Sequence, residues 1–189
     1  MFRSFLVPLI AFATLNVCLK CYGQTIWTGP NITFSKASGA DPMSAANQDR
    51  ITDNVWLTRD SSRGIYNIAA EDFYTNSLSP ADTEWAFPFN NPLAQPTDLT
   101  ATNWAALVFE DWETANGGAP SGPPDTVDQP AVLHLISDNI YLNIMFTEWG
   151  GAGGGPFTYE RSTAIPEPAS LGLIGVAIVA VLGMRAKRT

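Results

Sequence analysis

The sequence predicts an all-β fold: a single β-sandwich of the jelly-roll type, preceded by a signal peptide and followed by a hydrophobic helix. Short runs rich in Val, Ile, Thr, Tyr, Phe and Trp recur along the chain, and Gly, Pro, Asn, Asp and Ser separate them. Residues 24–162 carry no long helical hydrophobic period. This central part has the length of one domain.

Eight segments have the composition of strands, and two of them form the clearest hairpin. Ser137, Asp138 and Asn139 supply turn chemistry between two apolar segments, residues 132–136 and 140–147. In the second segment apolar residues alternate with mixed ones, as in a sheet that covers a core. The expected strands are residues 32–35, 54–58, 65–68, 84–87, 104–109, 132–136, 140–147 and 157–161.

Few other elements are expected between these strands. Residues 69–74 and 80–84 have local helical character, each for about one turn. Residues 88–100 and 115–129 are rich in Pro and Gly and are expected to form long loops. The glycine-rich residues 150–155 are expected to form a flexible hairpin connection, because no helix follows them to hold a phosphate.

The N-terminal end has the pattern of a secretory signal peptide, residues 1–23. Arg3 provides a positive charge, residues 5–17 are apolar, and Gly23 ends a plausible cleavage site. Cleavage there removes both Cys18 and Cys21, so that the mature domain contains no disulfide. Lipid attachment at Cys18 is the alternative.

The C-terminal end combines three features in a fixed order. Pro166-Glu167-Pro168 is followed by an uncharged apolar run, residues 169–184, and then by the basic residues Arg185, Lys187 and Arg188. As a helix this run would be about 24 Å long, which is short for a bilayer core of about 30 Å. The basic cluster favours a cytoplasmic C-terminus and an outward-facing domain.

This arrangement resembles the PEP-CTERM sorting signal of bacterial exported proteins. The resemblance implies recognition by a membrane-embedded exosortase, cleavage near Pro-Glu-Pro, and delivery of the domain to the cell surface or an extracellular matrix. An ordinary tail anchor is the alternative. The expected organisation is a signal peptide (1–23), an exported domain (24–162), a linker (163–168), a transmembrane sorting helix (169–184) and a basic cytoplasmic tail (185–189).

The exported domain is strongly acidic. It contains 17 of the 18 acidic residues and 5 of the 10 basic ones, a net charge of about −12. Such a charge repels nucleic acid and anionic membrane surfaces, so that neither is expected as a partner of the domain. Cations, basic proteins and neutral polymers remain as partner classes.

No catalytic framework is evident, and an enzyme is not expected. His134 is the only histidine, and no serine stands in a Gly-x-Ser-x-Gly turn. Glu110 and Asp111 are a carboxylate pair of the kind that glycosidases use, but neighbours in a strand point to opposite faces. A small hydrolase acting through Glu110, Asp111 or His134 remains a third alternative. No cofactor is expected.

Four oxygen-bearing residues are candidates for a calcium site: Asp41, Asn47, Asp49 and Asp53. Their spacing does not match an EF-hand loop, and Arg50 could pair with one of the acids. No metal is therefore assigned, and the four residues stand as candidates only.

The chain contains 6 tryptophans, most of which are expected to pack in the core. Trp112 and Trp149, near acids and glycines at predicted strand ends, are the candidate glycan contacts. The expected function is a non-enzymatic surface or matrix protein. The alternative is a carbohydrate-binding sandwich, with or without calcium, that binds exopolysaccharide.

Overall fold

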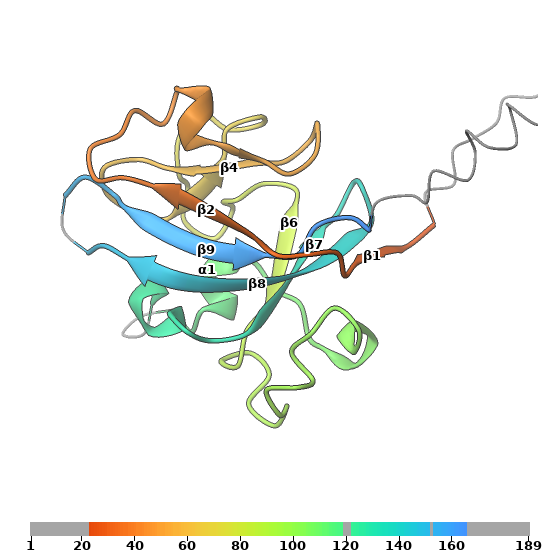
Figure 1. Cartoon of the computed structure of the whole chain (residues 1–189). Coiled ribbons are helices and arrows are strands. Elements are labelled where there is room, and N and C mark those ends of the chain that lie inside the picture. The colour runs from red at the N-terminus through yellow and green to blue at the C-terminus, as the bar shows by residue number, and fades with distance from the viewer. Residues whose placement is uncertain (1–22, 119–121, 152, 166–189) are drawn as a thin grey trace, which may run out of the picture.

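The structure, a computed structural model, describes residues 23–118, 122–151 and 153–165 (Figure 1). The larger sheet has the strand order β2-β9-β8-β7-β6, with β1 paired to β8, and the smaller sheet has the order β3-β4-β5. Helix is scarce, so the all-β prediction is confirmed. The strands are β1 (Thr25–Trp27), β2 (Ile32–Lys36), β3 (Asp49–Arg50), β4 (Trp56–Arg59), β5 (Ile65–Asn67), β6 (Thr83–Ala86), β7 (Ala131–Leu135), β8 (Ile140–Trp149) and β9 (Phe157–Arg161).

The predicted hairpin is strands β7 and β8, paired from Leu135 and Ile140 onwards. Asn139 takes a left-handed backbone conformation (φ 52°) in the turn, which its short polar side chain tolerates. Strand β8 runs further than predicted. A bulge between Phe146 and Glu148 lets it stay paired with β9 up to its last residue.

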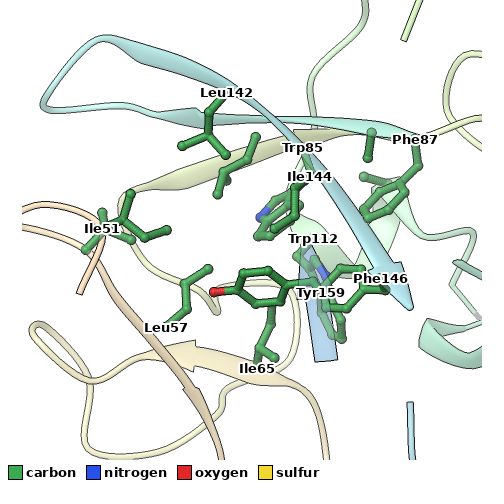
Figure 2. Packing of buried hydrophobic residues seen from close by; sticks show 14 of the residues in the cluster. Ile51, Leu57, Ile65, Trp85, Phe87, Trp112, Leu142, Ile144, Phe146 and Tyr159 are labelled. Atoms are coloured by element: carbon green, nitrogen blue, oxygen red, sulfur yellow. The ribbon is translucent and has the colours of Figure 1, made fainter. Parts of the chain in front are cut away.

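The two sheets enclose one hydrophobic core (Figure 2). The smaller sheet and the turn between β3 and β4 contribute residues such as Ile51, Leu57 and Ile65, and the larger sheet contributes aromatic residues such as Trp85 and Phe146. All five are buried, and removal of this apolar surface from water is the main force that holds the sheets together. The pair of sheets forms a sandwich around this core.

The predicted strand at residues 104–109 is wrong. Trp104–Ala106 forms a 3-10 turn, and Glu110 makes only a single β-bridge, with Trp85. The Trp104 ring stacks on Tyr141 with ring centroids 4.4 Å apart. Side-chain packing therefore holds this apolar segment on the larger sheet, without a ladder of backbone hydrogen bonds.

The two predicted helical turns are also wrong. Residues 69–74 form turns after β5, where Ala70 and Glu71 both donate to the carbonyl of Asn67. Within residues 80–84 strand β6 already begins at Thr83, because pairing with β7 outweighs the weak local preference. The helical elements of the described residues are α1 (Trp112–Ala115) and 3-10 turns at Ala45–Asn47, Trp104–Ala106 and Pro123–Thr126.

The two ends of the described domain lie side by side (Figure 1). The amide of Gly29 donates to the carbonyl of Thr163 at 2.8 Å, and the Ser162 hydroxyl donates to the carbonyl of Trp27 at 2.7 Å. Thr163 Oγ1 also donates to the carbonyl of Pro30 at 2.8 Å. The N-terminal and C-terminal segments therefore leave the sandwich at the same end.

Among residues 23–118, 122–151 and 153–165, no helix has the length and apolarity that a membrane crossing requires. Residues 1–22 of the predicted signal peptide lie outside the described residues. The same is true of the Pro-Glu-Pro motif, the predicted sorting helix (169–184) and the basic tail (185–189).

Candidate functional site

A pocket of about 400 Å³ opens beside α1, and Trp112 and Trp149 are among the residues that line it. We call it the aromatic pocket. It brings together segments that are far apart in the sequence: the end of β4, the turn after it, the loop around Tyr74, α1 and the end of β8. The lining residues used below are Arg59, Arg63, Tyr74, Trp112, Asn116 and Trp149, with Glu113 beside them.

Helix α1 positions Trp112, which with Tyr74 and Trp149 forms the aromatic wall of the pocket. Asp111 caps this helix, its Oδ1 accepting from the amides of Glu113 and Thr114 at 3.1 Å each. Trp112, in the first turn, is only 2% exposed and meets the Trp149 ring at a centroid distance of 5.6 Å. The cap thus fixes the direction from which Trp112 enters the pocket.

Gly64 allows the aromatic wall to pack this closely. A Cβ atom at position 64 would lie 2.4 Å from the Tyr74 ring and 2.5 Å from the Trp112 ring. Tyr74 meets Trp112 edge-on, with centroids 6.2 Å apart and ring planes at 81°. Any larger residue at position 64 would displace one of the two rings.

Arg59 carries a buried positive charge at the pocket. Its side chain donates to the carbonyls of Arg63, Gly150 and Pro156 at 2.8 to 3.0 Å, and its Cζ lies 3.8 Å from the Trp149 ring centroid. Burial lowers the pKa of Arg59 to about 10, so it remains charged at neutral pH. Among the described residues, no carboxylate forms an ion pair with Arg59 or Arg63.

Two donors at the pocket have no acceptor. The Nε1 atom of Trp112 and the Nδ2 atom of Asn116 are buried and make no hydrogen bond. Asn116 is 1% exposed. A buried donor without a partner costs about 1–3 kcal/mol, and such groups are rare in folded proteins. Both unpaired groups are donors, so what they lack is a hydrogen-bond acceptor.

Glu113 is the acid of the pocket, and its carboxylate already has partners. It accepts from the Ser77 amide at 2.8 Å and from Tyr74 Oη and Asn76 Nδ2 at 3.3 Å each. Burial, followed by the charge and hydrogen bond of Glu113, raises the pKa of Tyr74 to about 12. Glu113 therefore holds the loop at residues 74–77 against α1, and Tyr74 stays protonated at neutral pH.

The structure brings the two candidate glycan contacts, Trp112 and Trp149, to one pocket. Trp112 is almost fully buried, because its rings pack against Tyr74 and Trp149. Sequence reasoning missed Arg59, Arg63 and Asn116. A signal available in the sequence was Arg59, directly after the predicted strand at residues 54–58, since an arginine that becomes buried requires partners from elsewhere in the chain.

The structure brings Asp41 and Asn47 into contact but does not gather the four calcium candidates at one site. Both carboxylate oxygens of Asp49 bind Arg161, at 2.6 and 2.8 Å. Asp41 Oδ1 accepts from the amide of Met43, Asn47 Nδ2 donates to the carbonyl of Asp41, and Asp53 lies exposed in the turn before β4. In the part of the chain that the structure describes, no group of three or more His, Cys, Asp or Glu could hold a metal ion.

Arg50, which could have paired with one of these acids, instead has other partners. Its Nε and Nη2 atoms donate to Gln48 Oε1 at 3.2 and 2.9 Å. Its Cζ lies 4.1 Å from the Trp56 ring centroid. This exposed arginine therefore stacks on a tryptophan outside the aromatic pocket.

The three residues considered for hydrolysis lie in separate settings. His134 Nδ1 lies 2.6 Å from Glu84 Oε1, and the ring stacks on Tyr141 with centroids 4.0 Å apart. Glu110 bridges to Trp85 through the backbone, and Asp111 caps α1. The carboxylate of Asp138, close to His134 in sequence, accepts from Thr52 and Asn54. The structure thus gives Asp111 and Asp138 structural partners.

Comparison with protein families gives one match. The PEP-CTERM protein-sorting motif matches residues 164–188, which include all the residues predicted for the sorting signal: Pro166, Glu167, Pro168, Arg185, Lys187 and Arg188. The predicted recognition is confirmed for this C-terminal segment. A comparison with curated proteins finds no match, and a comparison with solved structures finds none either.

Proposed function

We propose that this exported protein, sorted at the membrane by exosortase through its PEP-CTERM motif, ends at the cell surface or in an extracellular matrix and acts there without catalysis. The observation that carries the proposal is the match of residues 164–188 to the sorting motif. The strongly acidic composition of residues 24–162 suits a domain that remains soluble outside the cell.

The position of the motif relative to the folded domain supports cleavage as the sorting step. The last hydrogen bonds of the described domain involve Ser162 and Thr163, and Pro166 follows within three residues. A cut at Pro-Glu-Pro would separate the sandwich from residues 169–189 and leave these hydrogen bonds in place. The folded domain would then be released from the membrane as a whole.

The test is the C-terminal mass of the mature protein in a host that contains exosortase. We expect the mature chain to end near residues 166–168, and a Glu167→Gln variant to accumulate uncut in the membrane fraction. Glu160→Gln makes the same chemical change in β9, outside the motif, and should be processed normally. A mature surface protein that still ends in Thr189 would contradict the proposal.

A second function, carbohydrate binding, is favoured by the aromatic pocket. Its wall of Tyr74, Trp112 and Trp149 offers apolar surface for sugar C–H groups, and its unpaired donors suit sugar oxygens. We propose that the domain binds a saccharide there, and that a cell-surface polysaccharide supplies it. The next subsection develops the ligand chemistry together with its test.

A further inference from the structure

We infer that the aromatic pocket binds a carboxylate-bearing sugar, such as a uronic acid unit of an acidic polysaccharide. The inference rests on the proposed carbohydrate-binding function and narrows its ligand. Three features of the described residues support it: the distribution of positive charge, the unpaired donors, and the separate engagement of Glu113.

Positive charge gathers at this pocket although the domain as a whole is acidic. Residues 24–162 contain 5 basic side chains. Two of them, Arg161 and Arg50, have partners elsewhere: Arg161 pairs with Asp49, and Arg50 contacts Gln48 and Trp56. Arg59 and Arg63 both line the pocket. A neutral sugar would not use two guanidinium groups, whereas a carboxylate would.

Lys36 adds to this positive region. Its Nζ atom is buried and has no hydrogen-bond partner. Its pKa is lowered, first by burial and then by the charge of Arg59. Lys36 and the two pocket arginines, Arg59 and Arg63, thus form no ion pair among the described residues, although the charges of Asp60 and Asp41 partly raise the pKa of Lys36. An anion bound in the pocket would relieve their mutual repulsion.

The unpaired donors fit the same ligand. An ionised carboxylate only accepts hydrogen bonds, and Trp112 Nε1 and Asn116 Nδ2 only donate them. Arg63 is exposed beside the pocket, and no hydrogen bond or ion pair of its guanidinium occurs among the described residues. Its backbone takes the left-handed region (φ 76°), an unusual conformation for arginine.

Glu113 distinguishes a sugar acid from a simple anion. The negative charge of the Glu113 carboxylate would repel phosphate or sulfate, because these anions offer few donors that could compensate for the repulsion. A sugar carries hydroxyl donors as well as its carboxylate, so a hydroxyl can face Glu113 while the acid group faces Arg63. The volume of about 400 Å³ is within the usual range for small-ligand pockets.

The experiment is calorimetric titration of the full chain in detergent with an oligoglucuronate and with a neutral glucose oligosaccharide of equal length. We expect the acidic ligand to bind at least about tenfold more tightly, a difference of about 1.4 kcal/mol. Arg63→Gln should remove most of this preference, and added salt should weaken binding of the acidic ligand. Arg50→Gln removes the same charge outside the pocket and should have no effect.

Trp112→Phe tests the buried donor, because it removes Nε1 and keeps an aromatic ring. We expect it to weaken binding of the oligoglucuronate. Asn116→Leu removes the other donor and is the second variant, should Trp112→Phe fail to fold in a thermal-unfolding control. Binding that survives Arg63→Gln and both donor variants would place the site elsewhere and overturn the inference.

The remaining outcomes separate this inference from the function on which it rests. Equal binding of the neutral oligosaccharide would overturn the acidic preference and leave carbohydrate binding standing. Equal binding of acetate would show a simple anion site and contradict the inference that the ligand is a sugar. Absence of binding by either oligosaccharide would contradict both the inference and the carbohydrate-binding function.

Discussion

At the scale of single residues, two buried arginines of the domain have different kinds of partner. Arg161 is buried against Asp49, with which it forms an ion pair at 2.6 Å. Burial alone would lower the pKa of Arg161, but its hydrogen bonds and charge interaction with Asp49 raise it. Arg59 is equally buried and binds only carbonyl oxygens and a tryptophan ring. This contrast distinguishes a structural charge from one that can serve a ligand.

Tyr74 allows a prediction of pH dependence. Its pKa is about 12 in the folded chain and about 10 in the unfolded chain, so its stabilising contribution is complete below pH 10 and decreases as the pH rises to 12. The Tyr74→Phe variant does not lose stability in this way, because phenylalanine does not ionise. Allowing for partial exposure, we expect the stability of the wild type relative to Tyr74→Phe to fall by about 1 kcal/mol between pH 9 and pH 11.

The measurement is chemical denaturation of both chains at pH 9, 10 and 11. The other titrating groups are common to both chains, so their effects cancel in the difference. A difference in unfolding free energy that does not change with pH would show that Tyr74 ionises equally easily in the folded and unfolded chains.

At the scale of elements, one polar cluster joins the two sheets. Asp49 belongs to β3 of the smaller sheet, and Arg161 and Tyr159 belong to β9 of the larger one. Tyr159 Oη donates to Asp49 Oδ2 at 2.7 Å, beside the Arg161 ion pair. The two-residue strand β3 is therefore held by a charge inside the sandwich as well as by its pairing with β4.

Asp49→Asn should destabilise the domain strongly. It leaves the Arg161 guanidinium buried without its counter-charge, a change that typically costs about 3–5 kcal/mol. The measurement is the unfolding free energy in a double-mutant cycle with Arg161→Met. We expect Arg161→Met to cost less in the Asp49→Asn background than in the wild type, and strict additivity would contradict a coupled pair.

At the scale of the whole molecule, the sandwich joins the two ends at which processing is predicted. Strand β1 begins just after the predicted signal-peptide cleavage site, and Ser162 and Thr163 directly precede the matched sorting motif. Hydrogen bonds at Gly29, Trp27 and Pro30 connect these segments. The opposite end of the sandwich, where β8 ends and β9 begins, can then face away from the membrane (Figure 1).

Gly29→Ala should disrupt this junction. A Cβ atom at position 29 would lie 2.5 Å from the carbonyl oxygen of Ala164, so the backbone must shift. We expect a loss of about 1–3 kcal/mol in unfolding free energy and faster proteolysis near residue 164. Gly151→Ala, where a Cβ would meet no heavy atom within 4 Å, is the matched control. Equal stability of the two variants would contradict the close contact.

Local composition was sufficient to predict much of the fold. The alternation in β8, the turn at residues 137–139 and the density of β-branched and aromatic residues predicted the antiparallel strands and the all-β class. The prediction of a strand at residues 104–109 was wrong because an apolar run indicates only that the segment will be buried. Whether it joins a ladder depends on neighbours that the run itself does not contain.

The candidate site divides in the same way between sequence and structure. The all-β class, the acidic charge and the sorting motif follow from the amino-acid order alone, because each depends on residues that are neighbours in the chain or on a simple count. The folded arrangement was needed to show that Arg59, Asn116 and Trp149 share a pocket, and that Asp49 binds Arg161. Such contacts depend on strand register and on close-packed side chains, which join residues too far apart in the sequence for any local pattern to connect.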